Sequence, residues 1–176
     1  MIKKYTLSLG KIENLGFLIE YQFKNLNFVN FLKKQIKNNV GLMDYKTNVK
    51  GKMTNFTTFN KNKIFNNLLR ECIEVTHILN LPKSILKDSW GNILKKGDCV
   101  DLHSHYRSTI SGILYLTEGG PGTYFPQLNK NIDEKIGKIV LFSGNLLHSV
   151  PIYKGNKDRY TIAFNFEEII NWNETK

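Results

Sequence analysis

Apolar and polar residues alternate over short stretches in the second half of the chain, which is the pattern of β-strands with one buried face. Glycine-rich turns separate these stretches, as at 118–122 and 143–145. The pattern predicts strands at 85–93, 98–106, 109–117, 122–126, 137–142, 146–152 and 159–167. Many short strands at close spacing are typical of a sandwich, a barrel or a jelly roll.

The first half of the chain combines two predicted strands with two predicted helices. Residues 3–9 and 16–22 are rich in the β-branched and aromatic residues that strands favour. Apolar residues recur at helical spacing over 25–37 and 61–79, which predicts two amphipathic helices. Asn60 stands just before the second of these and is the expected N-cap.

With 176 residues the chain can bury one hydrophobic core without disulfides, and no linker-like segment divides it. We therefore expect a single domain over 1–176. It would consist of a helix-containing part over 1–84, a jelly-roll core over 85–167 and a tail over 168–176. The expected fold class is mainly β, a double-stranded β-helix with the two N-terminal helices packed on one sheet, and the polar stretch 39–60 would add one short edge strand.

Composition narrows the classes of protein to consider. No apolar run approaches the roughly 20 residues of a membrane span, and the N-terminus lacks the features of a signal peptide. Cys72 and Cys99 have no metal-type spacing and predict reduced thiols in a cytoplasmic protein. The net charge of +10 comes almost entirely from lysines spread along the chain, so it does not favour a nucleic-acid partner.

Three of the four histidines are placed where one metal ion would need them. His103 and His105 are two residues apart in a predicted strand, so both side chains can lie on one face and bind one ion. Such pairs are more often exposed or hydrogen-bonded than metal-bound. His148 changes that balance, because it follows strand 137–142 and a tight turn, where a jelly roll returns toward the first pair. Imidazole suits iron, zinc, copper and nickel alike.

Arg159 is the second chemical signal. It would share one face of strand 159–165 with small and polar residues, while aromatic and branched residues take the core face (Thr161, Ala163 and Asn165 against Tyr160, Ile162 and Phe164). A guanidinium in a cavity binds best to a carboxylate, and no acidic residue on this strand provides one. We expect an anionic ligand. The alternative is a surface arginine paired with a residue remote in sequence.

Together these segments resemble the iron(II)- and 2-oxoglutarate-dependent oxygenases, above all the small oxygenases of bacteria and their phages. The resemblance covers roughly residues 85–167 and depends on the order and spacing of its motifs. These motifs are Trp90-Gly91-Asn92, Lys96-Gly97-Asp98, His103-Ser104-His105, 111–116, 137–142, His148-Ser149-Val150 and 159–165.

The resemblance implies a dioxygenase that couples oxidative decarboxylation of 2-oxoglutarate to hydroxylation of an unidentified substrate. Fe(II) would be the cofactor and 2-oxoglutarate the cosubstrate. His103 and His148 match the two histidine ligands of the family, and Arg159 matches the basic residue that pairs with the far carboxylate of 2-oxoglutarate. Tyr115 and Asn165 are the further residues expected at the cosubstrate.

One position departs from the family pattern. The usual triad has a carboxylate two residues after the first histidine, and this chain has His105 there. Either His105 is the third ligand, or Asp101 supplies a carboxylate while His105 orients a ligand or substrate. We favour His105, because it occupies the motif position and imidazole is a competent ligand.

Two other functions are consistent with the sequence. Gly97 precedes His103 by six residues and Gly137 precedes His148 by eleven, as in the two motifs of a cupin, although the usual cupin glutamate is missing. A cupin-type metal protein would be a dioxygenase that needs no 2-oxoglutarate, an isomerase or a sensor. The third possibility is a jelly-roll binding protein that has lost its catalytic activity.

Overall fold

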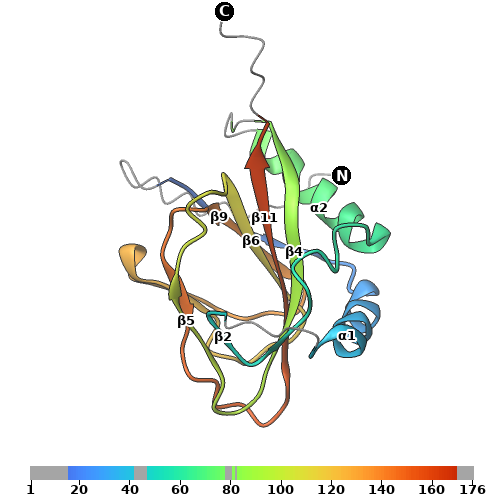
Figure 1. Ribbon diagram of the computed structural model, residues 1–176, viewed down its shortest axis with the longest axis vertical. Helices are drawn as coiled ribbons and strands as arrows, with labels where there is room; N and C mark the ends of the chain where they lie inside the picture. Colours follow the sequence, from blue (N-terminus) through green and yellow to red (C-terminus); the bar gives the residue numbers. More distant parts are fainter. Residues whose placement is uncertain (1–15, 42–46, 78–80, 82, 170–176) are drawn as a thin grey trace, which may run out of the picture.

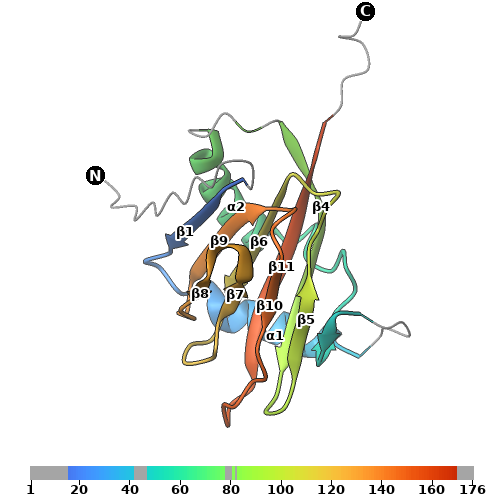
Figure 2. The same cartoon turned by 90° about the vertical axis from the view of Figure 1, so that its left-hand side faces the viewer.

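The computed structural model describes residues 16–41, 47–77, 81 and 83–169. The strand expected at 3–9 and the last residues of the expected tail lie outside this part of the chain. The described residues form two antiparallel β-sheets that lie one over the other, with two helices outside the larger sheet (Figures 1 and 2). The structure is therefore mainly β, as the alternation of apolar and polar residues predicted.

The larger sheet has six strands in the order β1-β9-β6-β11-β4-β3. Their bounds are Leu18–Gln22 (β1), Lys138–Ser143 (β9), Ile110–Tyr115 (β6), Arg159–Glu168 (β11), Ser84–Leu94 (β4) and Lys52–Met53 (β3). The smaller sheet has five strands in the order β2-β5-β10-β7-β8. Their bounds are Val49–Lys50 (β2), Cys99–His103 (β5), His148–Val150 (β10), Thr123–Phe125 (β7) and Lys130–Ile132 (β8).

All seven strands predicted from residue 85 onward are present, most of them shorter than predicted. β8 was not predicted, because Ile132 is its only apolar residue and no alternation marks it. The short edge strand expected within 39–60 is present as two pieces, β2 and β3, which pair with β5 and β4 respectively. The first 84 residues thus contribute strands to both sheets.

Helices α1 (Phe28–Asn39) and α2 (Lys63–His77) pack on the outer face of the larger sheet (Figure 1). Their apolar stripes join the outward side chains of the sheet in one buried cluster, which includes Leu32, Ile36, Phe65, Leu69, Ile162 and Phe164. Gly91 on β4 permits the close approach of α1, since a Cβ atom there would lie 2.4 Å from Ile36.

The expected cap of α2 needs a correction. The side-chain oxygen of Asn62, not Asn60, accepts a hydrogen bond from the amide of Phe65 at 3.0 Å, as an N-cap does. Asn60 instead donates to the carbonyl of Lys87 at 2.7 Å and accepts from the hydroxyl of Ser89 at 2.6 Å. It therefore ties the segment before α2 to β4.

The two sheets enclose a second apolar cluster, to which both contribute (Leu18, Ile113, Tyr115, Phe125, Ile132, Val140, Phe142 and Leu146). In Figure 2, β5, β10 and β7 of the smaller sheet lie in front of the larger sheet. A cavity lies between the sheets, lined by side chains of β4, β5, β10 and β11 among others. Among the described helices, neither is sufficiently long and apolar for a membrane span.

Candidate functional site

The pairing of β5 with β10 brings two of the three candidate histidines together. His103, the last residue of β5, is opposite His148, the first residue of β10, and their ring centroids are 4.3 Å apart. His105 lies two residues beyond β5, where its amide donates to the carbonyl of Gly144 at 2.7 Å. Its ring centroid lies 5.0 Å from that of His103 and 5.2 Å from that of His148. One ligand atom from each ring lies within 4.8 Å of the others, a group that could hold a metal ion.

Backbone hydrogen bonds set the tautomers of two of these rings. Nδ1 of His103 lies 2.7 Å from the carbonyl oxygen of Asp101, and Nδ1 of His148 lies 3.0 Å from that of Leu146. A carbonyl only accepts, so each Nδ1 carries the proton and donates it. The lone pair of each ring is then on Nε2, the arrangement that a metal-binding histidine requires.

Burial keeps the rings neutral. It lowers the pKa of His148 to about 3 and that of His105 to about 4, with a further contribution from the positive charge that a neighbouring histidine would carry. Burial also lowers the pKa of His103. A neutral imidazole offers its lone pair to a cation without first losing a proton.

The cavity beside the histidines measures about 50 Å³ and has mostly apolar walls. That is several times the roughly 10–15 Å³ that one water molecule needs. Besides the histidines and Thr123, the polar groups on its wall come from β4 and β11, with Trp90 and Asn92 on the first strand and Arg159 and Thr161 on the second. Trp90 also contacts His105 edge to face, with ring centroids 5.9 Å apart.

Two of these polar groups lack a partner. The indole Nε1 of Trp90 and the amide Oδ1 of Asn92 are buried without a hydrogen bond among the described residues. Buried polar atoms are nearly always paired in folded proteins, and leaving one unpaired costs about 1–3 kcal/mol. Since both atoms belong to residues that line the cavity, a polar ligand bound there would supply the missing partners.

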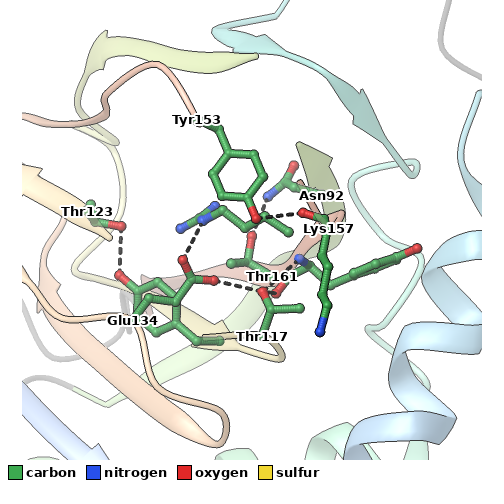
Figure 3. A network of polar contacts seen from close by, with 10 residues as sticks. Asn92, Thr117, Thr123, Glu134, Tyr153, Lys157 and Thr161 are labelled. Atoms are coloured by element: carbon green, nitrogen blue, oxygen red, sulfur yellow. Dashed lines mark hydrogen bonds and ion pairs between the residues drawn. The ribbon is translucent and has the colours of Figure 1, made fainter. Parts of the chain in front are cut away.

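Arg159 begins β11 and is 2% exposed. Its Nε donates to Oε2 of Glu134 at 3.1 Å, and Oε1 of the same carboxylate accepts from the hydroxyl of Thr117 at 2.7 Å (Figure 3). The sequence expectation is therefore corrected in one respect. Arg159 is buried in the cavity wall, as expected, but it also has a carboxylate partner 25 residues earlier in the chain. Its two terminal nitrogens make no hydrogen bond within the described residues.

Tyr115 and Asn165 do not line the cavity. The hydroxyl of Tyr115 donates to the hydroxyl of Thr123 at 2.7 Å, and complete burial raises its pKa to about 12. Thr123 does line the cavity, so Tyr115 reaches the site through this contact. Asn165 accepts a hydrogen bond from Ser111 at 2.8 Å, farther along β11 than the residues of the cavity wall.

Asp101 does not join the histidines. Its carboxylate pairs with Lys50 at 2.8 Å, and 48% of its side chain is exposed. The expectation that Asp101 and His103 share a strand face fails because the pairing of β5 with β10 shifts register between His148 and Val150. A bulge of this kind rotates the strand, so that residues two apart no longer point the same way.

Several residues of the site were not predicted from the sequence. Glu134 lies in the segment after the unpredicted β8, and nothing in its local sequence connects it with Arg159. Trp90 and Asn92 were named only as part of the motif at 90–92, with no role in the site, although they lie two apart on a predicted strand and so share a face. The strand pattern alone does not say that this face meets the cavity, since that depends on how the two sheets pack.

Comparison with known proteins supports the fold. No family model and no curated protein matches the chain. Among solved structures, a viral collagen prolyl hydroxylase from Paramecium Bursaria Chlorella virus-1, in its 2-oxoglutarate complex, is similar with a TM-score of 0.69. The identity is 17%, over 86% of this chain and 96% of that one.

Two further structures extend the comparison. A prolyl-4-hydroxylase from Pseudomonas putida has a TM-score of 0.60 at 15% identity, over 87% of this chain and 93% of that one. HygX from Streptomyces hygroscopicus, with nickel and 2-oxoglutarate bound, has a TM-score of 0.65 at 12% identity, over 87% and 83%. The chain therefore has the fold of the 2-oxoglutarate- and iron(II)-dependent oxygenases, and the resemblance found in its sequence is confirmed at that level.

Proposed function

We propose that the two sheets form a double-stranded β-helix and that the protein is a non-haem iron dioxygenase. It would couple oxidative decarboxylation of 2-oxoglutarate to hydroxylation of a substrate still to be identified. One observation carries the proposal: a single cavity is lined by three imidazoles and by a buried guanidinium (His103, His105, His148 and Arg159). This combination suits a dicarboxylic acid. One end of the acid would bind a metal held by the imidazoles, and the carboxylate at its other end would pair with the guanidinium.

The donor set fits iron(II). Three neutral imidazoles would occupy three positions of an octahedral ion and leave the rest for the cosubstrate and dioxygen. His105 is the proposed third ligand, since the carboxylate of Asp101 lies on Lys50. When bound, iron and 2-oxoglutarate together would supply the oxidising power for attack on a C–H bond.

The chain's own residues would position the acid and exclude water. The terminal nitrogens of Arg159 would donate to the distal carboxylate, and Trp90 Nε1 would donate to another oxygen. Exchanging oxygen and nitrogen in the amide of Asn92 preserves its 3.4 Å contact with the Thr161 hydroxyl, which can donate as well as accept. Asn92 then becomes a further donor, and a wall of donors suits a molecule with two carboxylates.

The test measures 2-oxoglutarate consumption and succinate release by purified protein with Fe(II) and dioxygen, before any substrate is known. We expect slow uncoupled turnover that disappears in His103→Ala and His148→Ala. Asp101→Asn serves as the control and should retain both metal binding and turnover. Absence of metal uptake and of succinate would contradict the proposal and favour an inactive binding protein. Metal uptake without any use of 2-oxoglutarate would favour the cupin-type alternative.

A further inference from the structure

The metal site has the neutral His105 where a carboxylate is usual. We infer that Glu134 supplies the missing negative charge at the opposite end of the cavity. It thereby reduces the protein's preference for a 2-oxo acid with a distal carboxylate over one with an uncharged end. This inference rests on the proposed function. Glu134 would act through Arg159, as a positioning residue that sets the selectivity for the cosubstrate.

The site of Glu134 is built for an ionised carboxylate. Its side chain is 1% exposed, and its two oxygens accept hydrogen bonds from Arg159 and Thr117 respectively (Figure 3). The Nε–H of Arg159 can only donate, so the oxygen that faces it accepts, and the other oxygen accepts from the Thr117 hydroxyl. Arginine is always charged in proteins, so the contact is a buried ion pair.

The chain also leaves room for this carboxylate. A Cβ atom on Gly120 would lie 2.0 Å from Oε2 of Glu134, so any larger residue at 120 would displace it. The ring of Tyr153 also lies near Gly120, and its hydroxyl donates to the carbonyl of Lys157 and not to the carboxylate (Figure 3). Glu134 itself does not line the cavity. It therefore acts on a ligand through Arg159 and through its charge.

A charge balance explains why the carboxylate would be there. In the usual two-histidine, one-carboxylate site, iron contributes two positive charges and arginine one, and the carboxylate removes one. Here three imidazoles remove none, but Glu134 removes one beside the arginine. Both arrangements total two positive charges, which a 2-oxo dicarboxylate neutralises.

The distribution of that charge differs, and selectivity follows from it. The metal end would hold the 2-oxo carboxylate with the ion's full charge, while Glu134 offsets the guanidinium at the far end. The distal carboxylate of 2-oxoglutarate therefore gains less from Arg159 than it would from an unpaired arginine. A 2-oxo acid with an uncharged end would therefore bind only a little more weakly than 2-oxoglutarate.

The experiment compares 2-oxoglutarate with 2-oxopentanoate, in which a methyl group replaces the distal carboxylate. Binding is measured by calorimetry with Mn(II) in place of iron, so that no turnover occurs. We expect the wild type to prefer 2-oxoglutarate by no more than about tenfold, and Glu134→Gln to raise that preference by about ten- to hundredfold. His105→Asp should weaken both acids alike, and the double variant should recover 2-oxoglutarate affinity while keeping the raised preference.

Each outcome decides between alternatives. If Glu134 only shapes the site, Glu134→Gln will leave the preference unchanged or lower it, because glutamine retains the shape without the charge. That result overturns the inference and leaves the proposed function standing. A wild-type preference above about a thousandfold overturns it as well, even if the variants fail to fold. If the wild type with Mn(II) binds neither acid, the proposed function fails and the inference fails with it.

Discussion

On its outer face the six-stranded sheet packs apolar side chains against α1 and α2, whereas its inner face turns polar and charged side chains toward the cavity. Both faces come from the same strands. On β11, Tyr160, Ile162 and Phe164 belong to the outer cluster, and Arg159 and Thr161 belong to the cavity wall.

The two faces differ in how completely their buried side chains find partners within the protein. The outer face buries apolar surface against the helices, which stabilises the folded state. The inner face also buries apolar residues against the smaller sheet, but around the cavity it buries an ion pair and two unpaired polar atoms, which stabilise the folded state little or destabilise it. Sites that bind ligands commonly carry such costs, because their polar groups are satisfied only when the ligand is present. The comparison predicts separable effects of substitution on stability and on binding.

The largest expected effect is on the outer face. Phe164→Ala should lower the free energy of unfolding by about 3–5 kcal/mol, because it empties a fully packed position against Phe65 and Gly112. Metal affinity of the protein that remains folded should not change. Denaturant unfolding and metal titration measure the two quantities. Phe31→Ala on α1, where the ring is 42% exposed, is the matched control and should cost less than about 1 kcal/mol.

Arg159→Met is a substitution on the inner face that should affect stability as well as binding. It leaves the carboxylate of Glu134 buried without its positive partner, so we expect a loss of about 3–5 kcal/mol in the free energy of unfolding. Adding Glu134→Gln to the same chain should restore most of that stability without restoring affinity for 2-oxoglutarate. A single variant that melts like the wild type would show that the ion pair does not matter for folding. Arg70→Met, on the exposed face of α2, controls for the loss of an arginine.

The outer face was the more predictable of the two from sequence. Periodicity in β11 and in the two helices is a local signal, and burial of one face follows directly from it. The histidine cluster was also predictable, because the i, i+2 spacing and the return of a later strand are both visible in the chain. The pairing of His103 with His148 bears this out.

Other parts of the inner face depend on contacts that local sequence does not encode. The partner of Arg159 comes from a segment 25 residues away that follows an unpredicted strand. Asp101 was placed on the wrong side because a bulge in β5 is a tertiary feature, set by the pairing with β10. Asn62 takes the cap in place of Asn60, because Asn60 is held by β4.

His148→Ala tests the inner face without disturbing the outer one. Losing this ring should weaken metal binding by at least about a hundredfold, since even indirect partners of metal ligands are worth ten- to hundredfold. The free energy of unfolding without metal should fall by no more than about 1–2 kcal/mol, through lost contacts with Phe125 and Phe142. Titration with Mn(II) and denaturant unfolding measure the two effects. Metal affinity within a few-fold of the wild type would exclude His148 as a ligand.

Asn92→Leu has the smallest expected effect on stability and on binding. It also gives the clearest contrast with a control, because the sign of its effect on stability should be opposite to that of Asn165→Leu. The asparagine and leucine side chains have similar size, and Asn92→Leu removes a buried amide atom that has no partner within the described residues. We expect the ligand-free protein to become more stable by about 1 kcal/mol, while 2-oxoglutarate affinity with Mn(II) falls several-fold. Asn165→Leu is the matched control on β11. Its oxygen is already bonded to Ser111, so the same change should destabilise the protein by about 1–3 kcal/mol and leave affinity unchanged.

Opposite signs at these two buried asparagines would show that the inner face keeps some polar groups for folding and others for a ligand. If Asn92→Leu destabilised the protein as Asn165→Leu does, its amide would be a structural group satisfied within the fold. The unpaired amide atom would then no longer support a polar ligand in the cavity. Calorimetric melting of the ligand-free proteins decides between these outcomes, because a shift of about 1 kcal/mol moves the midpoint by roughly 2–4 °C in a domain of this size.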